Sequence, residues 1–261
     1  MAADETPADF YDGLADDYHL IFADWDAAIA RQARVITDLL RKNHGLTSGA
    51  VLDASCGIGT QSIGLARAGF AVTATDISSA AVKRCAHEAA ARGLDITTGV
   101  ADLRVLDIDG AGCFDAVLSF DNALPHLLDD ADLRAACRAL RRAVRPGGAL
   151  LASIRDYDTV LRERPPGDLP RRFVTDAGER IVVQVWEWET DDRYVVRHFI
   201  MDGNAHRWTV TQRRTTYRAV SRAALSDALR GAGFEDIRWQ MPEETGFYQP
   251  VVSARSSALR R

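Results

Sequence analysis

Residues 50–60 read AVLDASCGIGT, a short apolar run that ends in an aspartate and leads into a loop with two glycines. A strand, a glycine loop and a helix make the nucleotide-binding turn of a doubly wound sheet. The dinucleotide pattern requires a third glycine, but Ser62 stands there, and no Gly-Lys-Ser/Thr follows as in an NTPase loop. Asp53 would repel a pyrophosphate and attract an ammonium group. The loop therefore favours a nucleoside that carries a cationic amino-acid group.

The chain around this loop alternates between strands and helices. Apolar strands are expected at 50–54, 70–76, 94–100, 114–120 and 149–154, and helices at 24–42, 60–69, 78–93 and 130–148. Repeated strand–helix units with apolar strands predict an α/β fold with a doubly wound, mostly parallel sheet. Helices are expected to cover both faces of that sheet.

The pattern changes after residue 157. Segments 182–189 and 194–201 are rich in β-branched and aromatic residues, which predicts inserted antiparallel strands. A helix capped by Ser221 and a closing pair of strands at 235–241 and 246–255 are then expected. We divide the chain into a closing segment at 1–30, a nucleoside-binding domain at 31–156 and 219–261, and an inserted segment at 157–218. The inserted segment is expected to be a lid or a subunit contact.

Acidic residues stand at the ends of three successive expected strands. Asp53 ends the first strand, Asp76 ends the second, and Asp102 follows the third. The carboxylate of Asp76 is suited to both hydroxyls of a ribose, and that of Asp102 to the exocyclic amine of adenine. Together with an ammonium group near Asp53, the three acids outline a site for S-adenosylmethionine.

With this loop and these acids, the chain resembles the class I S-adenosylmethionine-dependent methyltransferases from about Tyr11 to Arg255. The resemblance implies a Rossmann-like sheet of seven strands. Within that group the chain is similar to the glycine/sarcosine N-methyltransferase branch, in which Ser55 matches a small loop residue and Arg31 an arginine that grips the methionyl carboxylate. The cofactor contacts that the resemblance implies are Tyr11, Arg31, Asp53, Ser55, Gly57, Gly59, Asp76, Ile77, Ala101, Asp102, Leu103, Phe120 and His126.

The stretches SFDNALPHL at 119–127 and SIRDYD at 153–158 carry the acceptor side of this resemblance. Asn122 matches an asparagine beside the substrate amine, and Arg155 an arginine that holds the substrate carboxylate. Asp121 replaces a glycine of the branch, and Ile21, or Phe22 with a slip of one residue, stands where the branch has a tyrosine. These departures argue against glycine itself as the acceptor. The candidate catalytic residues are Asp121, Asn122, His126 and Arg155.

The resemblance implies methyl transfer from S-adenosylmethionine to a small molecule, with S-adenosylhomocysteine as the product. The expected acceptor is the amine of an amino acid or a related carboxylate-bearing amine, whose developing charge Asn122 or Asp121 would stabilise. A hydroxyl acceptor would instead require a base, for which His126 or Asp121 is the candidate. The alternatives are an O- or C-methyltransferase of specialised metabolism and a cofactor-binding protein without catalysis.

Composition and charge exclude several other functions. The formal net charge is −5 and the basic clusters are short, which argues against a nucleic-acid partner. No run approaches the roughly 18 apolar residues of a membrane span, and the acidic N-terminus is unlike a signal peptide. The four cysteines have no CxxC spacing, so neither a metal site nor a disulfide framework is expected. We expect a cytoplasmic enzyme that acts on a small-molecule substrate and can form a homo-oligomer.

Overall fold

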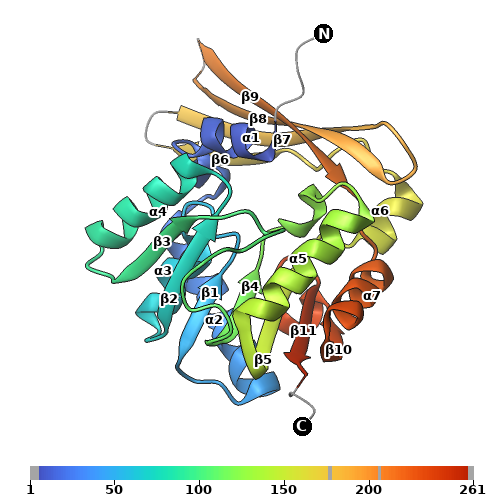
Figure 1. The fold of residues 1–261 in the computed structure, drawn as a ribbon. Helices are drawn as coiled ribbons and strands as arrows, with labels where there is room; N and C mark the ends of the chain where they lie inside the picture. The colour runs from blue at the N-terminus through green and yellow to red at the C-terminus, as the bar shows by residue number, and fades with distance from the viewer. Residues whose placement is uncertain (1–5, 176–177, 205–206, 258–261) are drawn as a thin grey trace.

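A computed structural model describes residues 6–175, 178–204 and 207–257 of the chain. Seven strands form one sheet in the order β10-β11-β5-β4-β1-β2-β3 (Figure 1). Only the two pairings of β11, with β10 and with β5, are antiparallel, so the predicted seven-stranded, mostly parallel sheet is confirmed. The strands are β1 Ala50–Asp53, β2 Ala71–Asp76, β3 Ile96–Val100, β4 Phe114–Ser119, β5 Val144–Ser153, β10 Phe234–Gln240 and β11 Val251–Ser256.

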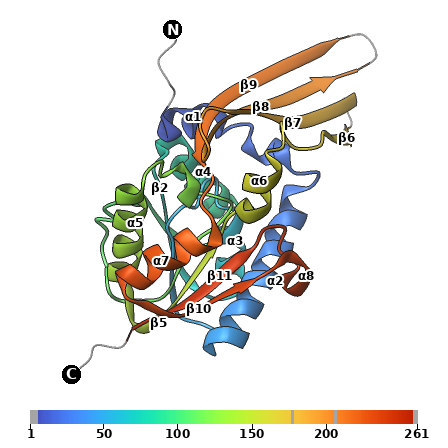
Figure 2. The same cartoon turned by 90° about the vertical axis from the view of Figure 1, so that its right-hand side faces the viewer.

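Helices cover both faces of this sheet, because successive strand residues point to opposite sides. Val51 and Leu118 are packed into a core with α2, α3 and α4, whereas Leu52 and Val117 are packed with α5 and α7. Figure 2 shows α5 and α7 on one side of the sheet and α2 on the other. The bounds are α2 Trp25–His44, α3 Thr60–Arg67, α4 Ser79–Ala91, α5 Asp130–Ala143 and α7 Arg222–Ala232.

The helix ends follow local side-chain chemistry. The Ser221 hydroxyl accepts the backbone N–H of Ala224 at 3.1 Å and caps α7, as the sequence predicts. Helix α5, however, ends at Ala143, before the Pro146, Gly147 and Gly148 that were expected to close it, because the next residue, Val144, is already extended and pairs with Phe114. Pro146 follows in β5; because proline has no backbone N–H, a helix that continued through it would lose a hydrogen bond. The extent predicted for this helix was therefore too long.

A second, antiparallel sheet with the order β6-β7-β8-β9 lies above the first in Figure 1. Its strands are β6 Arg171–Thr175, β7 Gly178–Trp188, β8 Arg193–Gly203 and β9 Trp208–Arg218. Strand β9 contacts α1 near the N-terminus, and α1 also contacts α4. The remaining short elements are α1 Pro7–Leu14, η1 Tyr18–Ile21, η2 Leu124–His126, α6 Tyr157–Glu163 and α8 Pro242–Thr245. In the described part of the chain, no helix combines the length and apolarity that a membrane crossing requires.

Candidate functional site

Two cavities meet where the parallel strands approach the antiparallel sheet. The first has a volume of about 620 Å³ and is lined by residues after β1, β2, β3 and β4 and by α1. The second, of about 710 Å³, is lined by residues after β4 and β5 and by the antiparallel sheet. Tyr11, Tyr18 and Asp121 line both cavities. Ligands in the two cavities would therefore face each other across these three side chains.

The glycine loop forms one wall of the first cavity. Ser55 and Gly57 line it, and Gly57 has a φ of +50°. Gly59 does not line the cavity; it caps α3 with a φ of +96°, and a Cβ atom there would lie 2.8 Å from Sγ of Cys85. Gly59 is therefore required by the backbone and by packing rather than by direct contact with a ligand.

Asp53 and Asp76 differ in how they relate to the first cavity. Asp53 is fully buried beneath the loop, where its Oδ2 accepts the Ser62 hydroxyl at 2.6 Å and its Oδ1 has no hydrogen-bond partner among the described residues. Burial raises the pKa of Asp53 to about 7. Asp76 lines the cavity and accepts the backbone N–H groups of Gly57 and Ser78, each at 2.9 Å. Burial also raises the pKa of Asp76.

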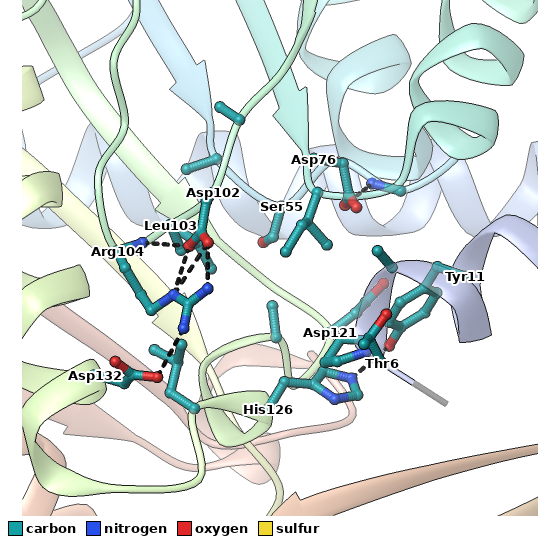
Figure 3. Close-up of a pocket in the computed structure, with 18 of the residues that line it drawn as sticks. Thr6, Tyr11, Ser55, Asp76, Asp102, Leu103, Arg104, Asp121, His126 and Asp132 are labelled. Carbon is teal, nitrogen blue, oxygen red and sulfur yellow. Dashed lines mark hydrogen bonds and ion pairs between the residues drawn. The ribbon is translucent and has the colours of Figure 1, made fainter. Parts of the chain in front are cut away.

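The far end of the first cavity is held by an ion-pair cluster. Arg104, which the sequence did not single out, donates to both oxygens of Asp102 and pairs with Asp132 at 3.0 Å. Its hydrogen bonds lower the pKa of Asp102, which stays ionised. Figure 3 shows this cluster opposite Tyr11 and Asp121. Four further residues expected at the cofactor also line this cavity: Ile77, Ala101, Leu103 and Phe120.

Tyr11 and His126 close the side of the first cavity that faces the antiparallel sheet. The Tyr11 hydroxyl lies 3.0 Å from Nε2 of His126 and 3.3 Å from the hydroxyl of Tyr217. Burial, aided by the charge of Arg155, lowers the pKa of His126 to about 3. A proton is therefore held poorly on this ring, which makes His126 a weak candidate for a general base.

Asp121 lies at the junction of the two cavities because of an unusual backbone. Asp121 and Asn122 have φ values of +56° and +68° directly after β4, a conformation that non-glycine residues rarely adopt. The Ser153 hydroxyl oxygen accepts the backbone N–H of Asp121 at 2.9 Å. The Asp121 carboxylate then accepts Gln61 Nε2 at 2.7 Å and the hydroxyl of Tyr248. Burial raises its pKa.

Arg155 lines the second cavity without an ion-pair partner among the described residues. Its Nη1 donates to the Tyr194 hydroxyl at 2.9 Å and its Nη2 to Oε1 of Gln184 at 2.6 Å. The guanidinium carbon lies 4.7 Å from the ring centroid of Trp186 and 5.1 Å from that of Tyr217. Burial lowers the pKa of Arg155, but the surrounding tyrosine hydroxyls outweigh that effect and raise it overall. The side chain is a permanent cation, and some of its N–H donors have no acceptor among the described residues.

Asn122 is buried beside Arg155, and both ends of its amide are engaged. Its Oδ1 accepts the backbone N–H of Arg155 at 3.0 Å, and its Nδ2 donates to the Tyr157 hydroxyl at 3.0 Å. These bonds join the loops that follow β4 and β5. In this structure Asn122 orients Arg155, and among the described contacts the second lone pair of Oδ1 and the second N–H of Nδ2 are left for a ligand.

Arg31, like Asp53 and Gly59, is a predicted cofactor residue that does not line the first cavity. It is exposed on α2 and lines the second cavity, not the first. Its neighbour Gln32 points inward instead and accepts Gln61 Nε2 at 2.6 Å. The helical turn thus directs Arg31 away from the glycine loop, although its spacing from Asp53 matched the resemblance.

Several lining residues were missed by the sequence reasoning. Alternation along expected strands was the only signal for Gln184, His198 and Tyr217. The second cavity, in particular, takes part of its polar wall from the antiparallel sheet and the loop before β11. The missed lining residues are Arg104, Gln184, His198, Tyr217 and Tyr248. Gln61 and Tyr157, which were also missed, line neither cavity but bond to Asp121 and Asn122.

Comparisons with known proteins identify the domain that carries the first cavity. Residues 51–148 match a family model described as a methyltransferase domain. A glycine/sarcosine N-methyltransferase of Halorhodospira halochloris is 30% identical over 158 residues, which cover 60% of this chain and 58% of that protein. A ubiquinone biosynthesis O-methyltransferase of Caulobacter vibrioides is 39% identical over 136 residues, which cover 48% of this chain and 51% of that protein. The match thus spans between half and three fifths of these curated relatives.

The fold is similar to that of an amino pentose methyltransferase of Micromonospora echinaspora, solved with S-adenosylmethionine bound. The TM-score is 0.74 at 19% identity, over 88% of this chain and 92% of that one. At this identity the likeness concerns the fold alone. Residues 51–148 are therefore a methyltransferase domain, within a chain that has the fold of S-adenosylmethionine-dependent methyltransferases.

Proposed function

We propose that this protein transfers a methyl group from S-adenosylmethionine to the amine nitrogen of a small molecule that carries a carboxylate. The first cavity would hold the methyl donor and the second cavity the acceptor. The observation that carries this proposal is Arg155, an enclosed cation at the wall of the second cavity, without a carboxylate partner among the described residues.

The residues of the first cavity fit the methyl donor. Asp76 is held by two backbone N–H groups and offers acceptor lone pairs to ribose hydroxyls. Asp102 is an ionised acceptor suited to the adenine amine, next to apolar walls from Ile77 and Leu103. Asp53 does not line this cavity, but its buried carboxyl, whose Oδ1 has no partner among the described residues, would favour a bound ammonium group from beneath the loop. When bound, S-adenosylmethionine supplies an electrophilic methyl group on a sulfonium.

Asp121 is suited to the nitrogen of the acceptor. Its carboxylate stands at the junction, and each of its oxygens accepts a hydrogen bond from one protein donor, which leaves lone pairs for an amine N–H. A fixed negative charge at this point would stabilise the positive charge that develops on nitrogen. Tyr11 and Tyr18, which line both cavities, would exclude water from the same place. Collinear placement of nitrogen, methyl and sulfur would supply most of the rate.

Arg155 would orient the other end of the acceptor. A guanidinium has five N–H donors, and two of them are used by Tyr194 and Gln184. The remaining donors can take a carboxylate through two parallel hydrogen bonds. The volume of about 710 Å³ is large for the smallest amino acids, in line with the departures from the glycine pattern.

Transfer to oxygen is the second candidate, supported by the likeness to a ubiquinone biosynthesis O-methyltransferase. A hydroxyl acceptor needs a base, and the pKa of about 3 for His126 argues against the histidine in that role. Asp121, whose pKa is raised, would then be the base.

A turnover screen tests the proposal. The purified protein is incubated with methyl-labelled S-adenosylmethionine and a panel of amino acids, N-methylated amino acids, amino sugars and phenols, and the products are identified by mass. We expect the label on the nitrogen of a carboxylate-bearing amine. Label only on a phenol, or only on an amino sugar without a carboxylate, would overturn the role given to Arg155.

A further inference from the structure

A buried histidine in the wall of the second cavity has one ring nitrogen without a partner. His198 lies on β8, opposite Gln184 of β7, and only 4% of the residue is exposed. Its Nδ1 lies 3.1 Å from Nε2 of Gln184, whereas its own Nε2 has no hydrogen-bond partner among the described residues. A buried polar nitrogen without a partner is costly, so its persistence calls for a ligand.

The neighbouring groups fix which nitrogen of His198 carries the proton. Oε1 of Gln184 accepts Nη2 of Arg155 at 2.6 Å and Nε1 of Trp186 at 3.2 Å. Both of these groups are donors only, so the amide oxygen must face them and the amide nitrogen must face His198. Nδ1 of His198 is then the acceptor. In the neutral ring, Nε2 therefore carries the proton and is a donor.

His198 is neutral in this position. Burial lowers its pKa to about 4, and the charges of Arg171 and Arg155 act in the same direction. The side chain thus presents a neutral N–H group rather than a cation. Arg155, Gln184 and His198 form one hydrogen-bonded chain along the cavity wall, so that the guanidinium and the imidazole ring are held by the same amide.

From this chain we propose that His198 is a specificity-determining residue that donates a hydrogen bond from Nε2 to an oxygen atom of the methyl acceptor. This inference rests on the proposed function and adds a second recognition point to Arg155. The oxygen belongs either to the carboxylate that Arg155 holds or to a further hydroxyl or carbonyl group of a longer acceptor. In both cases an acceptor that lacks such an oxygen is bound less well.

The tautomer is tested first, without turnover. Nitrogen-15 spectra of histidine-labelled protein near neutral pH are expected to show Nδ1 of His198 unprotonated and Nε2 protonated, with the assignment made by the loss of these signals in His198→Phe. The opposite tautomer would overturn the inference whatever the turnover screen gives.

Titrations with acetate and with L-serine then locate the oxygen, with the Arg155 side-chain resonance as the sign of binding. A shift of His198 Nε2 with acetate identifies the carboxylate, and a shift with L-serine alone identifies the further group. Binding at Arg155 without any shift at His198 overturns the inference. If neither compound moves the Arg155 resonance, the carboxylate site itself is wrong and the inference falls with it.

Kinetics with the acceptor found by the screen separate recognition from folding. We expect His198→Phe to raise KM about tenfold with kcat within about threefold, and His198→Gln, which keeps an N–H donor, to restore KM. Binding of S-adenosylhomocysteine should be equal in all three proteins. His44→Phe is the matched control, because His44 is also a largely enclosed histidine whose pKa burial lowers to about 4, yet it lines neither cavity. An unchanged KM in His198→Phe contradicts the inference.

Discussion

Replacing Arg155 with methionine should separate substrate recognition from folding. The two groups that Arg155 bonds both keep another partner: the Tyr194 hydroxyl lies 2.9 Å from that of Tyr157, and Gln184 Oε1 still accepts Trp186 Nε1. The substitution therefore leaves no buried group unsatisfied, and it removes a cation without an ion-pair partner among the described residues. We expect the free energy of unfolding to change by less than about 1.5 kcal/mol.

The effect of the same substitution on catalysis should be large. A hydrogen bond to a charged group contributes roughly 1.5–3 kcal/mol, and a carboxylate would lose two of them. With partial compensation by water, a loss of about 3 kcal/mol corresponds to a fall of roughly 100-fold in kcat/KM. Steady-state methyl transfer to the acceptor found by the screen measures kcat/KM, and urea unfolding measures the free energy of unfolding.

Arg164→Met is the matched control for this prediction. The guanidinium carbon of Arg164 also lies 4.7 Å from a tryptophan ring centroid, that of Trp188, but the residue lines neither cavity. We expect its kcat/KM to match that of the unchanged protein. If Arg155→Met keeps kcat/KM within about threefold, or if both variants lose activity equally, Arg155 does not hold the carboxylate of the acceptor.

Three further predictions concern the first cavity. The pKa of Asp53 is raised to about 7 in the folded protein, so its stabilising contribution is full below about pH 4 and is lost as the pH rises through 7. The unfolding free energy of Asp53→Asn, relative to that of the unchanged protein, should therefore increase by on the order of a few kcal/mol between about pH 5 and about pH 8. A difference in urea unfolding that stays constant with pH would contradict this. Gly59→Ala should cost about 1–3 kcal/mol in thermal unfolding because its Cβ would meet Cys85 in a left-handed backbone, and an unchanged Tm would exclude that strain. Asp102→Ala should weaken S-adenosylhomocysteine binding about tenfold by calorimetry, with Arg104 still paired to Asp132, and equal affinity would remove Asp102 from the site.

The parallel sheet and much of the first cavity were predictable from local patterns. The apolar run at 50–53, the glycine loop and the acids at successive strand ends are short-range features, and a parallel sheet brings strand ends to one edge whatever the rest of the chain does. Asp76 and Asp102 therefore line the same cavity although 26 residues separate them in the sequence.

The wall of the second cavity was not predictable in the same way. Alternation predicts strands, but which face of the inserted sheet meets the parallel sheet is decided by packing between distant segments. Tyr248 reaches Asp121 across 127 residues of sequence, and Gln184 contacts Arg155 only because the inserted sheet lies over β5. Arg31 is a wrong prediction of the opposite kind. Its spacing in the sequence predicted a place at the first cavity, but its helix directs it to the second cavity.

We propose that the acceptor is an amine recognised through its carboxylate. This proposal is tested most directly by matched pairs, in which the purified protein is offered each amino acid of the panel and the same compound as its methyl ester, with methyl-labelled S-adenosylmethionine. We expect a labelled nitrogen in the free acid and a loss of roughly 100-fold in kcat/KM for the ester. Equal turnover of acid and ester, or label on oxygen or carbon only, would contradict the proposal.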